Sequence, residues 1–518
     1  MVSSGNALAS IVGLQVMREG GNAVDAVIAT NAVLQVTSPF VCGLGGDLFA
    51  LIYEGATGTV HGFNGSGRSA HRLTREQVLA AGHMTMPRLG GLTVTVPGCV
   101  DAWAQLHQRF GSRPWANLFR PAIDYARDGH PASRGLSRQL QSGPERYGFD
   151  SWKRQFAPDS AWPKPGEVWR QTALAASLER VANEGRAGLY EGPLAQALVD
   201  EVLAHGGALS LDDLQRHHGE WAEPVSTTYR GHTVFETAPN SQGMTALIAL
   251  NLLDEVDVAA SGPNTPQTLM WLIEAAKHAY TARDSYLSDP DFAEIPTAWL
   301  LDKERARGVL AGGARAKPAA LSTAGDTTSF CVADPMGNAV SCIQSNYGGF
   351  GSGLAVGGFG LQNRGAYFSL DSNHVNRLEP GKRTLHTIMA GMVMSGAKPW
   401  ILFGAVGGDT QPQTHLQVLT NIIDHGMNVQ QAIESPRFVL GGEYGGELDR
   451  LLLEGRIPAE TAAGLENAGY TPEIAPSLDG LPGWSAGFGY GQGIVIDPAS
   501  GALFGGADPR WDAYAIGW

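Results

Sequence analysis

The sequence predicts an α+β protein in which helices and antiparallel sheets are stacked in layers. A hairpin pattern lies near the N-terminus, helical spacing dominates residues 98–300, and strand-like segments return after residue 326. Because strands and helices are grouped and do not alternate one by one, a regular βαβ winding is not expected. The chain has 518 residues, of which 43% are hydrophobic and 17% charged. This length allows two to four average domains or one large layered unit with an ample core, and it does not decide between them.

The first elements are two helices and a hairpin. Apolar residues at helical spacing predict a helix over 8–18, which a glycine pair ends. A second helix is expected to start after Asn22, because Asp25 three residues later completes a capping pattern. Strand patterns over 48–53 and 59–64 flank the turn sequence Gly-Ala-Thr-Gly and predict the hairpin. We expect the two helices to cover its sheet.

The middle and the end of the chain differ in type. Apolar spacing predicts a capped helix start at Ser210 and helices over 100–109, 118–128, 174–183, 193–205, 243–255 and 265–285. Residues 311–325 are small, polar and turn-rich, which is typical of an exposed connection. Beyond it we expect strands over 328–333 and 339–345, glycine loops, a helix over 412–424, and strands near 494–497 and 502–505.

Composition excludes several classes of function. Thirty-six basic and fifty acidic residues give a net charge of −14, and the basic ones are dispersed, so a nucleic-acid partner is not expected. No segment has the length of a membrane span, and no basic and then apolar leader begins the chain, so a cytoplasmic location is expected. Four cysteines without metal-type spacing predict core residues and neither a metal site nor a disulfide scaffold. No cofactor is expected. Sixty-eight glycines indicate many tight turns or close backbone approaches.

The segment Asp326-Thr327-Thr328 has two interpretations. It can be a strand that starts with two threonines. Alternatively, it can hold a nucleophile, because a threonine at the start of a chain can use its own α-amine, with a pKa of roughly 7.7–8, as the base that activates its hydroxyl. Thr327 is internal, so the second interpretation requires the chain to cut itself before this residue. The segment alone leaves both open.

A series of motifs runs in one order along nearly the whole chain. They are Gly20–Ala26, Gly43–Gly46, Leu211–Leu214 with Thr228–Gly231, Pro239–Gly243, Glu274–Lys277 with Asp289–Phe292, Gly404–Gly408, Ala432–Phe438 and Ala507–Arg510. In sequence and order they resemble the γ-glutamyltransferase family of N-terminal-nucleophile hydrolases. The resemblance implies a four-layer αββα fold. It also implies one precursor that is cut into a large piece, 1–326, and a small piece, 327–518, which stay associated as one intertwined unit.

The resemblance also implies a set of catalytic residues. The cut lies between Asp326 and Thr327, and Thr327 then acts as the nucleophile, with the hydroxyls of Thr328 and Ser345 beside it. Cleavage would proceed by attack of Thr327 Oγ on the carbonyl of Asp326, an acyl shift from nitrogen to oxygen, and hydrolysis of the ester. The backbone N–H groups of Gly407 and Gly408 match the family's oxyanion hole.

The residues at the substrate-binding positions differ from those of the family. Ser66 stands at the usual arginine position, with Arg68 two residues later, and Arg383–Thr387 replaces a serine motif. Tyr347 stands where the family has an asparagine, while Arg364 and Tyr367 replace a glutamine and an aspartate, so no acidic residue remains in this set. The predicted substrate-binding residues are Arg68, Tyr347, Asn363, Arg364, His386 and Thr387.

These substitutions predict a substrate that is an anion. A guanidinium in place of a carboxylate should repel an ammonium and bind a carboxylate through its two-pronged donor face. We therefore expect an amidohydrolase for a small carboxylate-bearing amide without an α-ammonium. In this the chain most resembles the family's oxamate-amidohydrolase branch, so oxamate is the first candidate, and a glutaryl-type acyl group is another.

Other interpretations stay open. The chain can keep γ-glutamyl hydrolysis or transfer on glutathione, or it can be an uncut, non-catalytic anion-binding relative. Arg364 can pair with a surface acid, and His386 can be structural. A homodimer is one option for the assembly.

Overall fold

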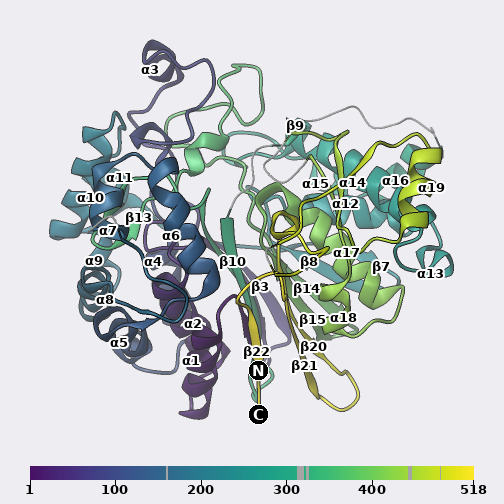
Figure 1. Cartoon of the computed structure of the whole chain (residues 1–518), viewed down its shortest axis with the longest axis horizontal. Coiled ribbons are helices and arrows are strands. Elements are labelled where there is room, and N and C mark those ends of the chain that lie inside the picture. The colour runs from purple at the N-terminus through teal and green to yellow at the C-terminus, as the bar shows by residue number, and fades with distance from the viewer. Residues whose placement is uncertain (159–160, 312–319, 322–325, 442–445, 479) are drawn as a thin grey trace.

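The computed structural model describes residues 1–158, 161–311, 320–321, 326–441, 446–478 and 480–518. Two large antiparallel sheets face each other in the middle of the molecule, and a layer of helices covers the outer face of each (Figure 1). The predicted α+β class with four αββα layers is therefore confirmed. Most of the predicted connection 311–325 lies outside the described residues.

The first sheet contains the predicted hairpin and the predicted cut. Its strand order is β22-β1-β10-β11-β2-β3-β6, and all neighbours are antiparallel. The strands are β1 (Val2–Ser4), β2 (Asp47–Glu54), β3 (Thr59–Asn64), β6 (Glu220–Ala222), β10 (Asp326–Ala333), β11 (Ala339–Tyr347) and β22 (Tyr514–Ile516). The hairpin β2–β3 confirms the prediction. Strands from both sides of residue 326 are interleaved, so neither piece could form this sheet alone.

The second sheet has the order β21-β20-β15-β14-β8-β7 and is also antiparallel. Its strands are β7 (Val225–Tyr229), β8 (His232–Glu236), β14 (Ala390–Ser395), β15 (Lys398–Ala405), β20 (Gly491–Ile496) and β21 (Leu503–Ala507). Sequence analysis missed the pairs β7–β8 and β14–β15. The first is a short hairpin in a segment expected to be mostly helical, closed by Arg230 and Gly231 with φ of 48° and 82°, as two-residue hairpin turns require.

Each sheet buries its outer face under helices. The first layer, against the first sheet, contains α1 (Ala7–Arg18), α2 (Ala23–Thr37), α4 (Cys99–Phe110), α5 (Arg120–Asp128), α8 (Thr172–Glu184) and α10 (Gly192–Ala204). The second layer contains α12 (Gly243–Leu253), α14 (Pro266–Tyr286), α16 (Lys303–Ala311), α17 (Gln411–Ile423), α18 (Val429–Glu434) and α19 (Ala459–Asn467). Asn22 and Asp25 form the predicted capping box of α2, and the four cysteines are buried as predicted.

Smaller elements complete the layers. The helices are α3 (Arg75–Ala80), α6 (Arg134–Arg146), α7 (Asp150–Phe156), α9 (Ala187–Tyr190), α11 (Leu211–Arg216), α13 (Val258–Ser261) and α15 (Thr297–Leu300). The strands are β4 (His130–Pro131), β5 (Val168–Trp169), β9 (Ala320–Leu321), β12 (Ala355–Val356), β13 (Phe359–Gly360), β16 (Phe438–Leu440), β17 (Gly446–Glu447), β18 (Leu451–Leu453) and β19 (Pro472–Ile474). No described helix has both the length and the apolar character needed to cross a membrane.

The two sheets approach closely where β15 crosses β10. A Cβ atom added to Gly404 in β15 would lie 2.4 Å from Ser329 Oγ in β10, so only glycine permits this contact. Ser341 Oγ in β11 donates to the carbonyl of Phe403 at 2.9 Å. Because β15 runs directly into Gly407 and Gly408, this contact carries the glycine turn to the same end of the sandwich as the start of β10.

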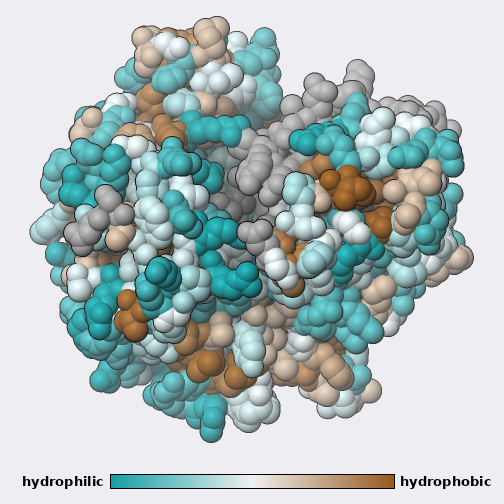
Figure 2. All heavy atoms as spheres, in the orientation of Figure 1, coloured by the Kyte–Doolittle hydropathy of each residue, from teal (hydrophilic) through white to brown (hydrophobic). Residues whose placement is uncertain are grey.

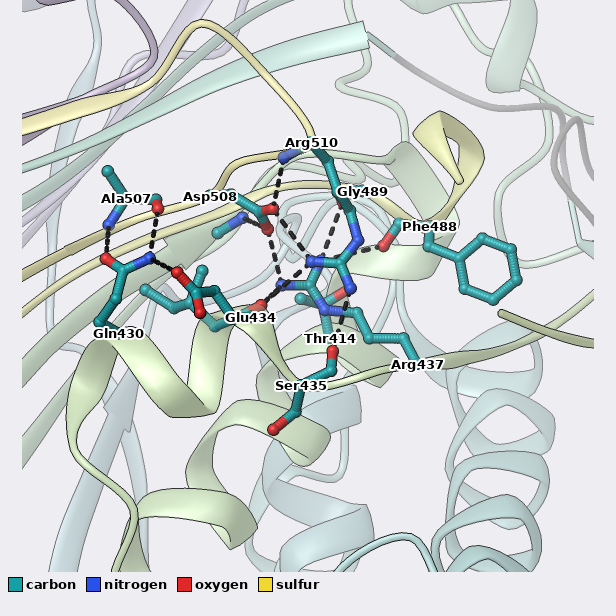
Figure 3. A network of polar contacts seen from close by, with 12 residues as sticks. Thr414, Gln430, Glu434, Ser435, Arg437, Phe488, Gly489, Ala507, Asp508 and Arg510 are labelled. Atoms are coloured by element: carbon teal, nitrogen blue, oxygen red, sulfur yellow. Dashed lines mark hydrogen bonds and ion pairs between the residues drawn. The ribbon is translucent and has the colours of Figure 1, made fainter. Parts of the chain in front are cut away.

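A buried ion network braces the segment before that turn (Figure 3). Arg437 donates to Asp508 Oδ2 at 2.7 Å and to the carbonyl of Gly489 at 2.9 Å, and Arg510 pairs with Asp508 at 3.0 Å. Gly489 in turn packs on the carbonyl of Val406, from which an added Cβ would be only 2.1 Å away.

On the face drawn in Figure 2, hydrophilic side chains predominate and hydrophobic ones form small separate patches.

Removing one member of this network should destabilise the fold strongly. In Arg437→Met, the free energy of unfolding in urea should fall by about 3–5 kcal/mol, because a buried charge pair loses one partner. Arg450→Met is the matched control, since Arg450 and Glu473 form an ion pair with both side chains about half exposed, at 50% and 54%, and exposed pairs contribute about 0–1 kcal/mol. Equal losses in both variants would contradict a bracing role for Arg437.

Candidate active site

Thr327 lies at the start of β10, where the ladder to β11 is irregular. Asp326 pairs with Tyr347 and Thr328 with Gln344, so β11 has one extra residue beside Thr327. Such bulges are common next to active sites because they redirect side chains. Tyr347 closes the irregularity with a left-handed φ of 76°, which is unusual for a residue with a side chain. Thr327 is fully buried.

Ser345 connects the predicted nucleophile to the rest of the site. Thr327 Oγ1 donates to Ser345 Oγ at 3.2 Å, and the same oxygen accepts from the N–H of Tyr347 at 2.8 Å and from Arg364 Nη2 at 3.4 Å. The structure therefore brings Thr327, Ser345, Tyr347 and Arg364 together, as predicted. Thr328 points elsewhere, because alternate side chains of a strand face opposite sides, and it lies against Gly5.

Arg364 is a fully buried guanidinium. Its Nη1 donates to Thr387 Oγ1 at 2.9 Å, and its plane lies over the ring of Tyr347, 4.3 Å from the centroid. Among the described residues, its Nε has no hydrogen-bond partner and no carboxylate forms an ion pair with it. Burial lowers the pKa of Arg364 to about 10, although the charge of Asp47 raises it. At neutral pH the site thus holds a cation with an unused donor.

Asp47 and His386 form a buried pair behind Arg364. His386 Nε2 donates to Asp47 Oδ2 at 2.9 Å, and its Nδ1 accepts from the N–H of Ile388 at 3.4 Å. Burial holds the pKa of His386 well below its usual value, so the ring is neutral. Both ring nitrogens are used, which favours the structural role for His386 over the substrate contact.

Asp47 should make anion binding depend on pH. Burial raises the pKa of Asp47 from 3.8 to about 7, against the charge of Arg364 and hydrogen bonds from Gln362, Gly67 and Gly98. Above this pH the ionised carboxylate opposes a substrate anion at Arg364. The dissociation constant of oxalate should therefore rise with pH through about 7, by up to about tenfold, the equivalent of one pKa unit of coupling.

The matched variant is Asp47→Asn, in which this step in the oxalate titration should disappear. The raised pKa of Asp47 also determines how its contribution to the stability of the fold changes with pH. Because the folded pKa lies above the unfolded one, the contribution of Asp47 to stability is fully present below about pH 4. It is lost as the pH rises through about 7. A step in oxalate binding of equal size in both proteins would contradict the coupling between Asp47 and Arg364.

Gly407 and Gly408 form the turn between β15 and α17. Gly407 has φ of 128° and Gly408 of 57°, conformations that glycine adopts readily. Within the described residues, neither backbone N–H has a hydrogen-bond acceptor. Gln242 Nε2 donates both to the carbonyl of Gly408, at 2.8 Å, and to that of Thr387, at 2.5 Å. The turn is thereby tied to Thr387, on which Arg364 is anchored.

Asp409, directly after the glycine pair, was missed by sequence analysis. It is buried, and its Oδ1 accepts from Arg283 and from Tyr367 OH, the latter at 2.7 Å. Its Oδ2 has no partner among the described residues. Burial raises the pKa of Asp409, while Arg283 lowers it. An acid therefore does lie near the predicted ammonium set, and it shares the charge of Arg283 with Asp284.

The structure corrects the prediction that Arg68 binds the substrate. Its guanidinium contacts Asp289 at 3.1 Å, Asp291 at 2.6 Å and Glu220 at 3.3 Å. These carboxylates already satisfy its charge, so Arg68 is not a candidate for holding a substrate carboxylate. The remaining predicted residue, Asn363, accepts from the N–H of Gly348 at 3.0 Å and donates to the carbonyl of Arg88 at 2.8 Å. It lines, with Tyr347, a cavity of about 480 Å³.

Comparison with known proteins identifies the family. The model of the gamma-glutamyltranspeptidase family matches residues 9–518. The chain belongs to this family. The glutathione hydrolase-like YwrD proenzyme of Bacillus subtilis is 42% identical to the chain over 527 residues. The alignment covers 100% of this chain and 98% of that protein. The oxamate amidohydrolase proenzyme of Klebsiella pneumoniae is 34% identical over 528 residues, covering 99% of this chain and 97% of that protein.

A solved structure agrees with the fold. The crystal structure of cephalosporin acylase from Bacillus halodurans superposes with a TM-score of 0.92 at 37% identity, covering 100% of this chain and 95% of that one. The predicted family, fold and amidohydrolase class are therefore confirmed. The threonine nucleophile, the position of the cut, the site residues and the substrate stay predictions.

Proposed function

We propose that this member of the gamma-glutamyltranspeptidase family cuts itself between Asp326 and Thr327 and then hydrolyses the amide of a small carboxylate-bearing substrate without an α-ammonium. Oxamate, which would give oxalate and ammonia, is the first candidate. Among its relatives, one is named an oxamate amidohydrolase and others are named acylases. Residues 1–326 and 327–518 would remain together through the shared sheets.

The observation that carries the proposal is the buried guanidinium of Arg364, which forms no ion pair with the residues that the structure describes. Burying a charge that forms no ion pair costs several kcal/mol. Although the charge of Asp47 acts on Arg364 from a distance, a buried cation with an unused donor beside a nucleophile is typical of a site for an anionic ligand. Arg364 reaches Ser345 Oγ, to which Thr327 also donates. A substrate carboxylate on the free Nε and the guanidinium face would therefore hold its amide carbonyl close to Thr327.

The same hydroxyl serves two reactions. In the precursor, Thr327 Oγ attacks the carbonyl carbon of Asp326, the acyl group moves from nitrogen to oxygen, and water opens the ester. The acyl shift frees the α-amine of Thr327. In later turnovers this amine can take the hydroxyl proton of Thr327. The positive charge of Arg364 one hydroxyl away would lower the pKa of that amine and keep it neutral, as a base must be.

Hydrolysis would then proceed through an acyl ester. Thr327 Oγ bonds to the amide carbon, the C–N bond breaks, and the departing nitrogen receives the proton that the α-amine had taken. Water, activated by the same amine, adds to the ester and releases the acid. The unpaired N–H groups of Gly407 and Gly408 would stabilise the oxyanion in both steps.

A γ-glutamyl substrate is the second candidate, and Asp409 is the observation that favours it. Its Oδ2 is buried and has no partner among the described residues, so it could accept from an ammonium. Arg283 pairs with Asp409 and also with Asp284, the latter at 2.7 Å, and Arg364 adds a second positive charge near Asp409. Two arginines beside this carboxylate support the substrate without an ammonium.

Two substrates separate the candidates. Purified, processed protein is incubated with oxamate, with ammonia release as the measurement, and with a γ-glutamyl anilide. We expect turnover of oxamate, or of a related carboxyacyl amide, at a higher kcat/KM than the anilide. Turnover of the anilide alone would overturn the proposal in favour of γ-glutamyl hydrolysis.

A further inference from the structure

A cavity of about 480 Å³ opens beside the predicted site, and two arginines that have no role in the proposed reaction line it. They are Arg88 and Arg146. Tyr347 and Asn363 form the wall toward the nucleophile, and three apolar side chains, Met86, Leu89 and Phe368, line other parts. Ligand sites of proteins usually have roughly 300–1,000 Å³. An amide that releases only ammonia would leave most of this space empty.

Both arginines are fixed close to the residues around Thr327. Asn363, the neighbour of Arg364, donates to the backbone carbonyl of Arg88 at 2.8 Å. Arg146 ends helix α6, and its Nη1 would be 3.4 Å from a Cβ added to Gly349, two residues after Tyr347. Arg88 therefore lies beside Asn363, and Arg146 lies beside the loop that follows Tyr347.

The cavity is positive in a chain that is negative as a whole. Neither Arg88 nor Arg146 forms an ion pair within the part of the chain that the structure describes, and none of the residues lining the cavity is acidic. Glu145, next to Arg146 in the chain, is exposed and is not part of the lining. With a net charge of −14 for the chain, two unpaired cations without a carboxylate between them form a local attraction for anions.

We propose that this cavity binds the amine half of the substrate, and that this half carries a carboxylate of its own, held by Arg88 and Arg146. The inference rests on the proposed function, in which Arg364 holds the carboxylate of the acyl half. Arg364 is fully buried, whereas Arg88 and Arg146 are exposed, so the amine half occupies the side from which a product can leave.

The substrate class that follows is an N-carboxyacyl amino acid with an apolar side chain, a dianion. Hydrolysis breaks its amide C–N bond and adds one water, of which the hydroxyl goes to the acyl carbon and the proton to nitrogen. The products are a dicarboxylate and an amino acid. The apolar lining from Met86, Leu89 and Phe368 suits the side chain of that amino acid.

Paired substrates test the subsite. N-glutaryl-phenylalanine is compared with N-glutaryl-phenethylamine, and N-oxalyl-phenylalanine with N-oxalyl-phenethylamine; the members of each pair differ only in the carboxylate of the amine half. Wild-type kcat/KM should favour the carboxylate member by about tenfold. In Arg88→Ala/Arg146→Ala this preference should fall to near one, mainly through KM, while turnover of the phenethylamides is unchanged and shows that the variant folds.

The control is Arg120→Ala, which removes an exposed arginine at the start of α5, outside the cavity lining. It should keep the wild-type preference. The subsite is overturned if the wild type shows no preference or if the double variant keeps it.

Failure of the proposed function has a different signature, because neither glutaryl nor oxalyl amides would then be hydrolysed. Calorimetric binding of N-acetylphenylalanine against N-acetylphenethylamine still decides the subsite. Tighter binding of the carboxylate that is lost in the double variant supports it, and equal binding of the two compounds by the wild type overturns it.

Discussion

Thr327→Ala will leave the chain as a single full-length band on a denaturing gel and will lower kcat by on the order of 10⁶, the loss that follows removal of a nucleophile from a hydrolase that works through an acyl intermediate. Without the hydroxyl, neither the N→O shift at Asp326 nor the acyl ester can form. In the wild type we expect two bands, for residues 1–326 and 327–518. Their N-terminal sequences, read by mass spectrometry, give the position of the cut.

Two variants make this result specific. Thr327→Ser keeps a hydroxyl and should still be cut, although more slowly. Ser329→Ala removes a buried hydroxyl two residues along the same face of β10, one that has no hydrogen-bond partner among the described residues, and it should be cut at the wild-type rate. A wild-type chain that stays uncut after long incubation would support the non-catalytic alternative, and a cut Thr327→Ala would place the nucleophile elsewhere.

Local signals in the sequence predicted much of the fold. Asn22 and Asp25 fixed the start of α2, and the strands 48–53 and 59–64 formed the expected hairpin, because capping and short-range pairing are decided by neighbours in the chain. The hairpin β7–β8 and the strands β14 and β15 were missed. β7 and β8 are short, and β14 is rich in methionine and glycine. β14 and β15 are held in the sheet by β8 and β20, which are distant in the sequence.

The candidate site shows the same division. Family motifs predicted Thr327, Ser345 and the glycine turn as site residues, but two buried acids were not predicted. Asp47 follows Gly45-Gly46 and Asp409 follows Gly407-Gly408. A carboxylate directly after a glycine pair was the available signal, since such turns bring backbone N–H groups and side chains into one buried place. No sequence pattern predicted the ion pairs: Arg68 pairs with acids that are distant in the sequence, whereas Arg364 forms no ion pair with the described residues.

Arg364→Met should change activity and stability in opposite directions. Hydrolysis of a carboxylate-bearing amide loses about 2–5 kcal/mol of transition-state binding, a fall in kcat/KM of roughly 30-fold to several thousandfold, because the anion loses its buried partner. Unfolding in urea should require as much free energy as in the wild type, or about 1–4 kcal/mol more, because replacing a buried charge with an apolar side chain of similar volume removes a desolvation cost.

This pair of measurements separates a binding arginine from a structural one. Among the described residues, the hydrogen bonds of Arg364 go to the hydroxyls of Thr387 and Ser345, and its guanidinium lies over the ring of Tyr347. Hydroxyls can turn to other partners when the guanidinium is gone. Arg364→Lys keeps the charge but not the planar donor face, so it should retain part of the activity. A large loss of stability together with unchanged selectivity for the carboxylate would mean that the guanidinium serves the fold. In that case the site would need another cation for its substrate, and among the predicted residues Arg68 is already committed to three carboxylates.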